Sequence, residues 1–217
     1  IAIIEARMSS KRLYGKVLKK INNKEVLKII IQRLGFSKLI DKVVVATTTD
    51  KTDDKIENFL KKNNFSYYRG SLNNVLGRVV KTGEKYKADV IVRVTADNPL
   101  TDPKIIDYML KYFLRNKKIN YLTNNNFGVS RKIAAGLDIC IFTLKDLKKI
   151  NKLLNNKIYK EYPTTYFYTK GKNKFTTKDI LLPKKLIIDN KYRLTLDNET
   201  DLKFFRKLFS LFKNKIN

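Results

Sequence analysis

Residues 42–48 have the sequence K-V-V-V-A-T-T and are followed by the polar residues Asp50 and Asp53. A continuous run of β-branched residues that ends in polar positions is typical of a strand buried on both faces. Residues 89–95, D-V-I-V-R-V-T, show the same pattern. Strands of this kind occur in parallel sheets covered by helices, so these two segments predict an α/β fold.

Helical and strand patterns alternate on either side of these two segments. Strands and helices at such short intervals imply right-handed βαβ units and a mostly parallel sheet. The predicted strands are 1–5, 42–48, 66–69, 89–95, 119–123, 137–142 and 193–196. The predicted helices are 23–34, 53–63, 74–86, 102–114, 143–154, 162–168 and 199–212. Residues 124–132 and 170–185 are expected to be mobile loops.

Length and composition indicate one globular domain. The chain has 217 residues, of which 43% are hydrophobic and 31% charged, and it has no Pro/Gly-rich linker and no internal repeat. No apolar run reaches the length of about 18 residues that a membrane helix needs. No secretory signal pattern opens the sequence, so we expect a cytoplasmic protein without membrane insertion.

Two residue types that often carry chemistry are scarce. His is absent and Cys140 is the single cysteine. Catalytic triads, Cys–His pairs, His-ligated metals and disulfide frameworks are therefore excluded.

The formal net charge of +27 permits two interpretations. It could indicate a polyanionic partner such as nucleic acid. The lysines are spread along the chain instead of forming a cluster, which favours a bias of composition over dedicated nucleic-acid binding.

The segment 6–16, A-R-M-S-S-K-R-L-Y-G-K, follows the first predicted strand and combines four basic residues with two serines and a glycine. In parallel sheets ligands bind beyond the carboxyl ends of the strands. Backbone N–H groups and cations at that edge suit a phosphate, although neither the Walker loop nor the dinucleotide-binding spacing is present. A basic surface loop is the alternative; the position favours phosphate binding.

Two aspartates also follow predicted strands. Asp97 comes two residues after the strand that ends at Thr95, and Asp197 follows 193–196 and precedes the last helix. Either could be a turn or helix cap. Together with the basic loop, however, they would suit Mg²⁺-assisted phosphoryl chemistry.

On these segments the sequence resembles the sugar-nucleotide cytidylyltransferases, the family of the CMP-sialic acid and CMP-Kdo synthetases, and within it the spore-coat polysaccharide branch labelled SpsF. The similar segments occur in the same order over most of the chain. They are I-I-E-A-R-M-S-S-K-R-L-Y-G-K (3–16), V-V-V-A-T-T-T-D (43–50), Y-R-G-S-L-N-N-V-L-G-R (68–78), R-V-T-A-D-N-P-L-T-D-P (93–103), A-G-L-D-I-C-I-F (135–142), K-E-Y-P-T-T-Y (160–166) and R-L-T-L-D-N-E-T-D-L (193–202).

The resemblance implies a Rossmann-like, GT-A-like α/β fold with a mostly parallel sheet flanked by helices. It implies a single nucleotidyltransferase domain over 1–217, with approximately 1–118 as the nucleotide-binding half. Residues 119–217 would form a smaller sugar-side lobe plus a closing strand and helix.

The resemblance also implies the site residues. The implied catalytic residues are Arg7, Lys16, Asp97 and Asp197, with the two aspartates as Mg²⁺ ligands. The residues implied to bind the nucleotide are Arg7, Ser10, Arg12 and Lys16 at the triphosphate, and Arg69, Ser71 and Thr95 at the base and ribose. Those implied to bind the sugar are Asp138, Glu161 and Tyr166.

The implied activity is the Mg²⁺-dependent joining of CTP to a sugar, an acidic one of the nonulosonate or Kdo type, with release of pyrophosphate, for surface polysaccharide synthesis by a homodimer. The hydroxyl proton could pass to a hydroxide on the metal or to a carboxylate such as Asp138. A glycosyltransferase of the same fold and a basic nucleic-acid-binding protein are the alternatives.

Two positions depart from the family pattern: Tyr14 stands where relatives have proline, and Tyr162-Pro163 where they have His-Val.

Overall fold

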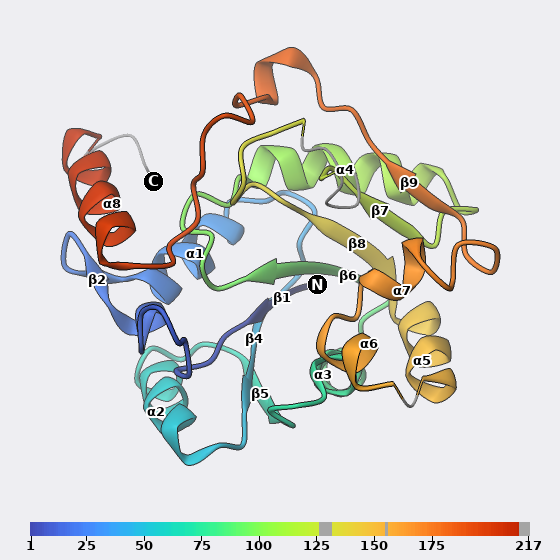
Figure 1. Cartoon of the computed structure of the whole chain (residues 1–217), viewed down its shortest axis with the longest axis horizontal. Coiled ribbons are helices and arrows are strands. Elements are labelled where there is room, and N and C mark those ends of the chain that lie inside the picture. Colours follow the sequence, from blue (N-terminus) through green and yellow to red (C-terminus); the bar gives the residue numbers. More distant parts are fainter. Residues whose placement is uncertain (126–131, 155, 213–217) are drawn as a thin grey trace.

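The computed structural model describes residues 1–125, 132–154 and 156–212. Within them, a seven-stranded sheet with the order β5-β4-β1-β6-β8-β7-β9 forms the centre of the molecule (Figure 1). Its strands are β1 (Ala2–Glu5), β4 (Val43–Thr48), β5 (Tyr67–Gly70), β6 (Val90–Thr95), β7 (Tyr121–Thr123), β8 (Cys140–Thr143) and β9 (Thr177–Asp179).

The strands of the first half are parallel. β1 pairs in parallel with β4 on one side and β6 on the other, and β4 pairs in parallel with β5. β8 runs antiparallel to both β6 and β7, and β9 is parallel to β7. The carboxyl ends of β1, β4 and β6 therefore meet at one edge of the sheet, which is where ligands bind in such folds.

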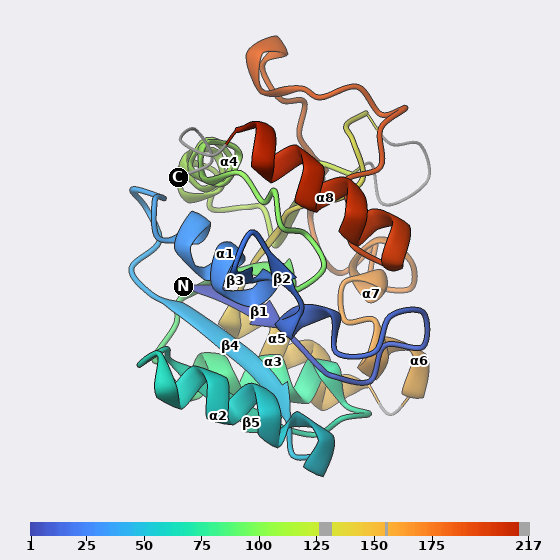
Figure 2. The ribbon, with the colours of Figure 1, turned by 90° about the vertical axis from the view of Figure 1, so that its left-hand side faces the viewer.

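Helices cover both faces of the sheet, so the predicted α/β fold is confirmed. α1 (Val26–Leu34), α2 (Asp54–Lys62), α4 (Pro103–Arg115) and α8 (Glu199–Leu211) pack on one face. α3 (Val75–Lys85), α5 (Leu144–Leu153) and α7 (Thr165–Tyr168) pack on the other. The fully buried side chains of β1 alternate between the two faces of the sheet. Ala2 and Ile4 pack in the core on the side of α1, and Ile3 packs in the core on the side of α3. In Figure 2, α8 lies above β1 and β4, and α3 lies below them.

The structure corrects three sequence-based expectations. Of the helix predicted over 162–168, the part that is helical is α7; Tyr162-Pro163 separates it from α6 (Lys157–Glu161), which was not predicted, because proline cannot continue a helix. The strand predicted over 193–196 is an extended segment whose one bridge joins Arg193 to Ala135. The loop predicted over 170–185 contains β9 and the start of a 3-10 turn, Lys184–Leu186.

Three further points complete the fold. The helix predicted to begin near residue 23 starts at Val26, after the small hairpin of β2 (Lys20–Ile21) and β3 (Lys24–Glu25). Most of the loop predicted over 124–132 lies outside the described residues. Within the described part of the chain, none of the helices has the length and apolar character needed to cross a bilayer.

Candidate active site

The basic loop after β1 is tied to the neighbouring strand through its backbone. Asp53 follows β4 and is almost fully buried. Its carboxylate accepts hydrogen bonds from the N–H of Met8 at 2.7 Å, from the N–H of Thr48 and from the hydroxyl of Thr48. The other end of the loop returns at Gly15, whose N–H donates to the carbonyl of Met8 at 2.9 Å. Gly15 has φ 66°, and a Cβ there would lie 2.8 Å from the Met8 side chain. The loop is therefore closed over Met8 and presents its polar side chains at the edge of the sheet.

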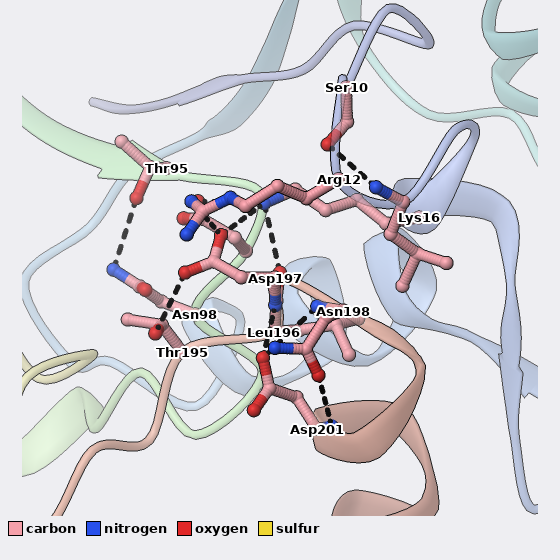
Figure 3. A network of polar contacts seen from close by, with 12 residues as sticks. Ser10, Arg12, Lys16, Thr95, Asn98, Thr195, Leu196, Asp197, Asn198 and Asp201 are labelled. Atoms are coloured by element: carbon pink, nitrogen blue, oxygen red, sulfur yellow. Dashed lines mark hydrogen bonds and ion pairs between the residues drawn. The ribbon is translucent and has the colours of Figure 1, made fainter.

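Lys16 ends this loop and lies between the two predicted metal ligands, Asp97 and Asp197. Figure 3 shows Arg12 and Lys16 beside Asp197. Its ammonium nitrogen is 3.0 Å from Oδ2 of Asp97 and 3.0 Å from Oδ1 of Asp197, and it also donates to the carbonyl of Leu196 at 2.9 Å. Arg12 reaches the same Asp197 oxygen at 2.8 Å. The two aspartates therefore converge on one cation position, supplied here by the loop.

The structure shows that Asp197 is not the cap of α8. The cap of α8 is Asn198, whose side chain accepts the N–H of Asp201 while Asp201 accepts the N–H of Asn198. The carboxylate of Asp197 instead pairs with Lys16 and Arg12 through Oδ1, and with Arg193 and Thr195 through Oδ2. Burial acts to raise the pKa of Asp197, but the hydrogen bond and charge of Lys16 and the charge of Arg12 outweigh it and lower that pKa.

The segment that carries Asp197 is docked by backbone contacts. The N–H of Leu194 donates to the carbonyl of Ala135 at 2.7 Å, and the N–H of Leu196 donates to the carbonyl of Asp97 at 2.8 Å. Gly136, with φ 101°, allows the close approach, since a Cβ there would lie 2.3 Å from the carbonyl oxygen of Leu194. Asp97 and Asp197 are consequently held together by main chain as well as by Lys16.

A cavity of about 990 Å³ opens at this edge. Six basic residues and four acidic residues line it, so it has the net positive character that suits a phosphate-bearing ligand. At its base Arg93 of β6 donates to both carboxylate oxygens of Glu5 of β1, at 2.7 and 2.6 Å. Burial acts to lower the pKa of Arg93, but the charge and hydrogen bonds of Glu5 raise it overall. The charges of Glu5 and Arg93 are thus satisfied within the protein.

The structure brings eight of the predicted site residues together. Those that line the cavity are Arg7, Ser10, Arg12, Lys16, Thr95, Asp97, Glu161 and Asp197. Tyr14 and Tyr162, at the two positions that depart from the family pattern, line it as well, and each is more than half exposed.

Four predicted site residues do not line the cavity. Arg69 forms ion pairs with Asp54 and Glu57 of α2, and Ser71 caps the turn before α3. Tyr166 is buried among aromatic rings, and Asp138 lies in the segment before β8. Their assignments to the base and the sugar stay predictions.

The sequence analysis did not identify two residues as part of the site. Asp53 fixes the basic loop, and the buried Arg78 of α3 lines the cavity. A polar residue that follows a buried strand could have pointed to Asp53, since that rule found Asp97. Arg78 ends the family-like segment 68–78, but nothing in the sequence shows that this helical arginine is buried.

A comparison with protein families assigns the chain. The model of the cytidylyltransferase family matches residues 1–215. The chain belongs to the cytidylyltransferase family. It is thus a nucleotidyltransferase enzyme, as the resemblance in sequence implied.

Individual relatives agree with this assignment. The chain is 32% identical to the spore coat polysaccharide biosynthesis protein SpsF of Bacillus subtilis, over 95% of this chain and 85% of that one. The solved structure of a cytidylyltransferase from Leptospira borgpetersenii is 38% identical, with a TM-score of 0.88 over 97% of this chain and 86% of that one. A CMP:2-keto-3-deoxy-manno-octonic acid synthetase, solved in complex with CTP, has the same fold at 15% identity, with a TM-score of 0.70 over 97% of this chain and 98% of that one.

Proposed function

We propose that this enzyme joins CTP to an acidic sugar of the nonulosonate or Kdo type in a Mg²⁺-dependent reaction that gives a CMP-sugar and pyrophosphate for surface polysaccharide synthesis. The observation that carries the proposal is the position of Lys16, at the end of a cationic loop and between Asp97 and Asp197. The name of the SpsF relative supports the polysaccharide role, and the CTP-bound structural neighbour supports the nucleotide.

The donor set suits Mg²⁺. Oδ2 of Asp97 and Oδ1 of Asp197 are both 3.0 Å from one nitrogen, so hard oxygen ligands already converge on a single cation. Among the described residues no group of three or more His, Cys, Asp or Glu could hold a metal. The remaining ligands would therefore be phosphate oxygens and water, as is usual for this ion. When bound, Mg²⁺ would neutralise charge on the reacting phosphate.

The side chains around this position suit the transfer of a nucleotidyl group. Arg7 and Arg12 would neutralise and orient the triphosphate, and Lys16 would turn from the carboxylates towards it. The sugar hydroxyl loses its proton to water and attacks the α-phosphate, the bond from that phosphorus to the pyrophosphate breaks, and pyrophosphate leaves. Glu161 and Tyr162 line the cavity from α6 and the turn after it, and would bound the space for the sugar.

The first experiment is thermal unfolding with CTP, UTP, ATP or GTP, each with and without Mg²⁺, followed by pyrophosphate release with CTP and a panel of sugar acids. A ligand at about 100 times its Kd adds roughly 2.7 kcal/mol, so binding is easily seen. We expect the largest Mg²⁺-dependent shift with CTP, and pyrophosphate with at least one sugar acid. Asp97→Asn should abolish turnover with the fold intact. Release of a free nucleoside mono- or diphosphate from a nucleotide sugar, without pyrophosphate, would instead indicate a glycosyltransferase.

A further inference from the structure

The helix α5 carries a basic surface that the proposed reaction does not use. Four exposed lysines of this helix line a second cavity, of about 380 Å³: Lys145, Lys148, Lys149 and Lys152. They are spaced three or four residues apart along the helix, so they lie on one side of it. The other side, with Leu147 and Ile150, is fully buried in the core. The helix therefore turns a row of cations away from the core and towards solvent.

The basic surface continues onto α3. Glu84 of α3 forms ion pairs with Lys148 at 2.9 Å and with Lys81 at 3.8 Å, so lysines of the two helices lie side by side. We call the resulting group of lysines the α5 patch; its members are Lys81, Lys145, Lys148, Lys149 and Lys152. The fold thus gathers charges from two helices that are separate in the sequence.

Most of the charge of the α5 patch is not neutralised within the protein. Lys149 is 3.8 Å from a carboxylate oxygen of the buried Asp146, and neither Lys145 nor Lys152 forms an ion pair with any residue that the structure describes. Asp89 is the single acidic residue among the described residues that line this cavity, against four lysines. Such a surplus of exposed positive charge attracts a partner with several negative charges.

A large apolar side chain lies at the edge of the α5 patch. Leu153 follows Lys152 in the last turn of α5 and is 61% exposed, although the next residue, Leu154, is buried. Lysines beside an exposed leucine on an amphipathic helix are typical of surfaces that bind at a membrane interface, where the cations contact headgroups and the apolar side chain enters among them.

The α5 patch lies at the opposite end of β6 from the candidate active site. Asp89, which lines the cavity of the patch, directly precedes β6, while Thr95 ends β6 and lines the active-site cavity. At a rise of about 3.3 Å per residue these two positions are about 20 Å apart along the strand. A partner bound at the α5 patch would therefore leave the active-site cavity open.

We propose that the α5 patch binds the anionic headgroup surface of a lipid bilayer, which makes this enzyme a peripheral membrane protein. A bilayer is favoured over a nucleic acid because neither α5 nor the described lining of its cavity includes an arginine or an aromatic side chain. Those are the groups that contact phosphates bidentately and stack on bases. Lysines act as point charges, and an array of them needs only the summed negative charge of a surface.

The test is co-sedimentation of the full chain with vesicles of phosphatidylcholine alone and of equal parts phosphatidylcholine and phosphatidylglycerol. We expect binding to the anionic vesicles only, and weaker binding as salt is added, because salt screens exposed charges. The combined variant Lys145→Gln, Lys149→Gln, Lys152→Gln should bind roughly 100-fold more weakly, since each lysine near an anionic membrane contributes a factor of about five. Leu153→Ser should weaken binding roughly three- to tenfold and leave its salt dependence unchanged.

The matched control is the combined variant Lys55→Gln, Lys62→Gln, Lys111→Gln. It removes the same charge from exposed lysines of α2 and α4, which cover the other face of the sheet and line neither cavity. This variant should bind the anionic vesicles nearly as the wild type does, and thermal unfolding shows that each variant is folded.

Three results would overturn the inference. The first is wild-type protein that does not bind the anionic vesicles. The second is an equal loss of binding in the two triple variants, which would mean that only the total charge matters. The third is binding to single-stranded RNA that is tighter than vesicle binding, is lost in the α5 triple variant and is unaffected by Leu153→Ser, which would assign the α5 patch to nucleic acid.

Discussion

The carboxylate of Asp53 accepts the backbone N–H of Met8 at 2.7 Å, across 45 residues of sequence. Because this contact fixes the middle of the basic loop, it controls where Arg7 and Arg12 stand relative to the aspartates. A residue that never lines the cavity thus positions those that do.

We predict that Asp53→Asn weakens CTP binding at least tenfold and destabilises the fold by about 1–3 kcal/mol, since an amide places a donor against the N–H groups that the carboxylate accepts. The measurements are chemical denaturation and nucleotide titration. Asp41→Asn, at an exposed carboxylate, is the control. Unchanged CTP affinity in Asp53→Asn would show that the loop holds its shape without this contact.

Lys16→Met should remove the cation that Asp97 and Asp197 share, while Arg12 still pairs with Asp197. Removing one partner from a mostly buried ion pair costs free energy, and we expect a loss of about 1–3 kcal/mol because the three side chains retain some exposure. Added Mg²⁺ should restore more stability to this variant than to the wild type, although turnover stays low. Lys19→Met is the control, because Lys19 pairs with Glu199 at the surface. Equal effects of Mg²⁺ on wild type and Lys16→Met would contradict convergence of the aspartates on one cation.

Gly136→Ala tests the docking of the segment that carries Asp197. The new Cβ would lie 2.3 Å from the carbonyl oxygen of Leu194, and φ 101° is unfavourable for any side chain. We expect destabilisation of about 3 kcal/mol or more and a loss of activity larger than the fraction of unfolded protein explains. Gly35→Ala should be close to neutral, since Gly35 has φ −65° at the end of α1. A Gly136→Ala enzyme with normal stability would mean that the segment shifts freely.

The pH dependence of stability should show a contribution from Glu57. Hydrogen bonds from Lys61, Tyr67 and Arg69 lower its pKa from 4.5 to about 2. A carboxyl with a lowered pKa in the folded state stabilises that state above its unfolded pKa, and this contribution is lost as the pH falls towards 2. The difference in unfolding free energy between wild type and Glu57→Gln should thus be constant above about pH 5 and shrink below it, as measured by urea denaturation from pH 3 to 7. A difference that does not change over this range would contradict the lowered pKa.

Much of the fold could be predicted from sequence because its central strands are unusually apolar. The β-branched runs that became β4 and β6 fit a doubly covered strand, and Asp102-Pro103 marks the start of α4, where Asp102 accepts the N–H of Lys104. The segment 193–196 was predicted as an apolar strand that leads into the last helix. Whether such a segment joins a ladder depends on what lies beside it, and here Gly136 leaves room for a single bridge.

The site residues could be predicted where they directly follow a predicted strand. This holds for Asp97, for Asp197 and for the basic loop. It does not hold for Arg78, because it occupies an ordinary helical position and only the fold shows that it is buried. Arg69 satisfied the family pattern, yet in the structure its guanidinium is held by Glu57 and Asp54.

The contact between Lys16 and Asp197 spans 181 residues. During synthesis, the parallel strands of the first half can pair before Asp197 has been translated, whereas the cation position cannot be completed until the segment around it docks against Ala135. Catalytic competence should therefore appear late in folding, after most of the core has formed. Because that docking depends on few backbone hydrogen bonds, amide hydrogen exchange at Leu194 and Leu196 should be faster than in β4. Local opening of this segment would abolish activity without unfolding the rest of the protein.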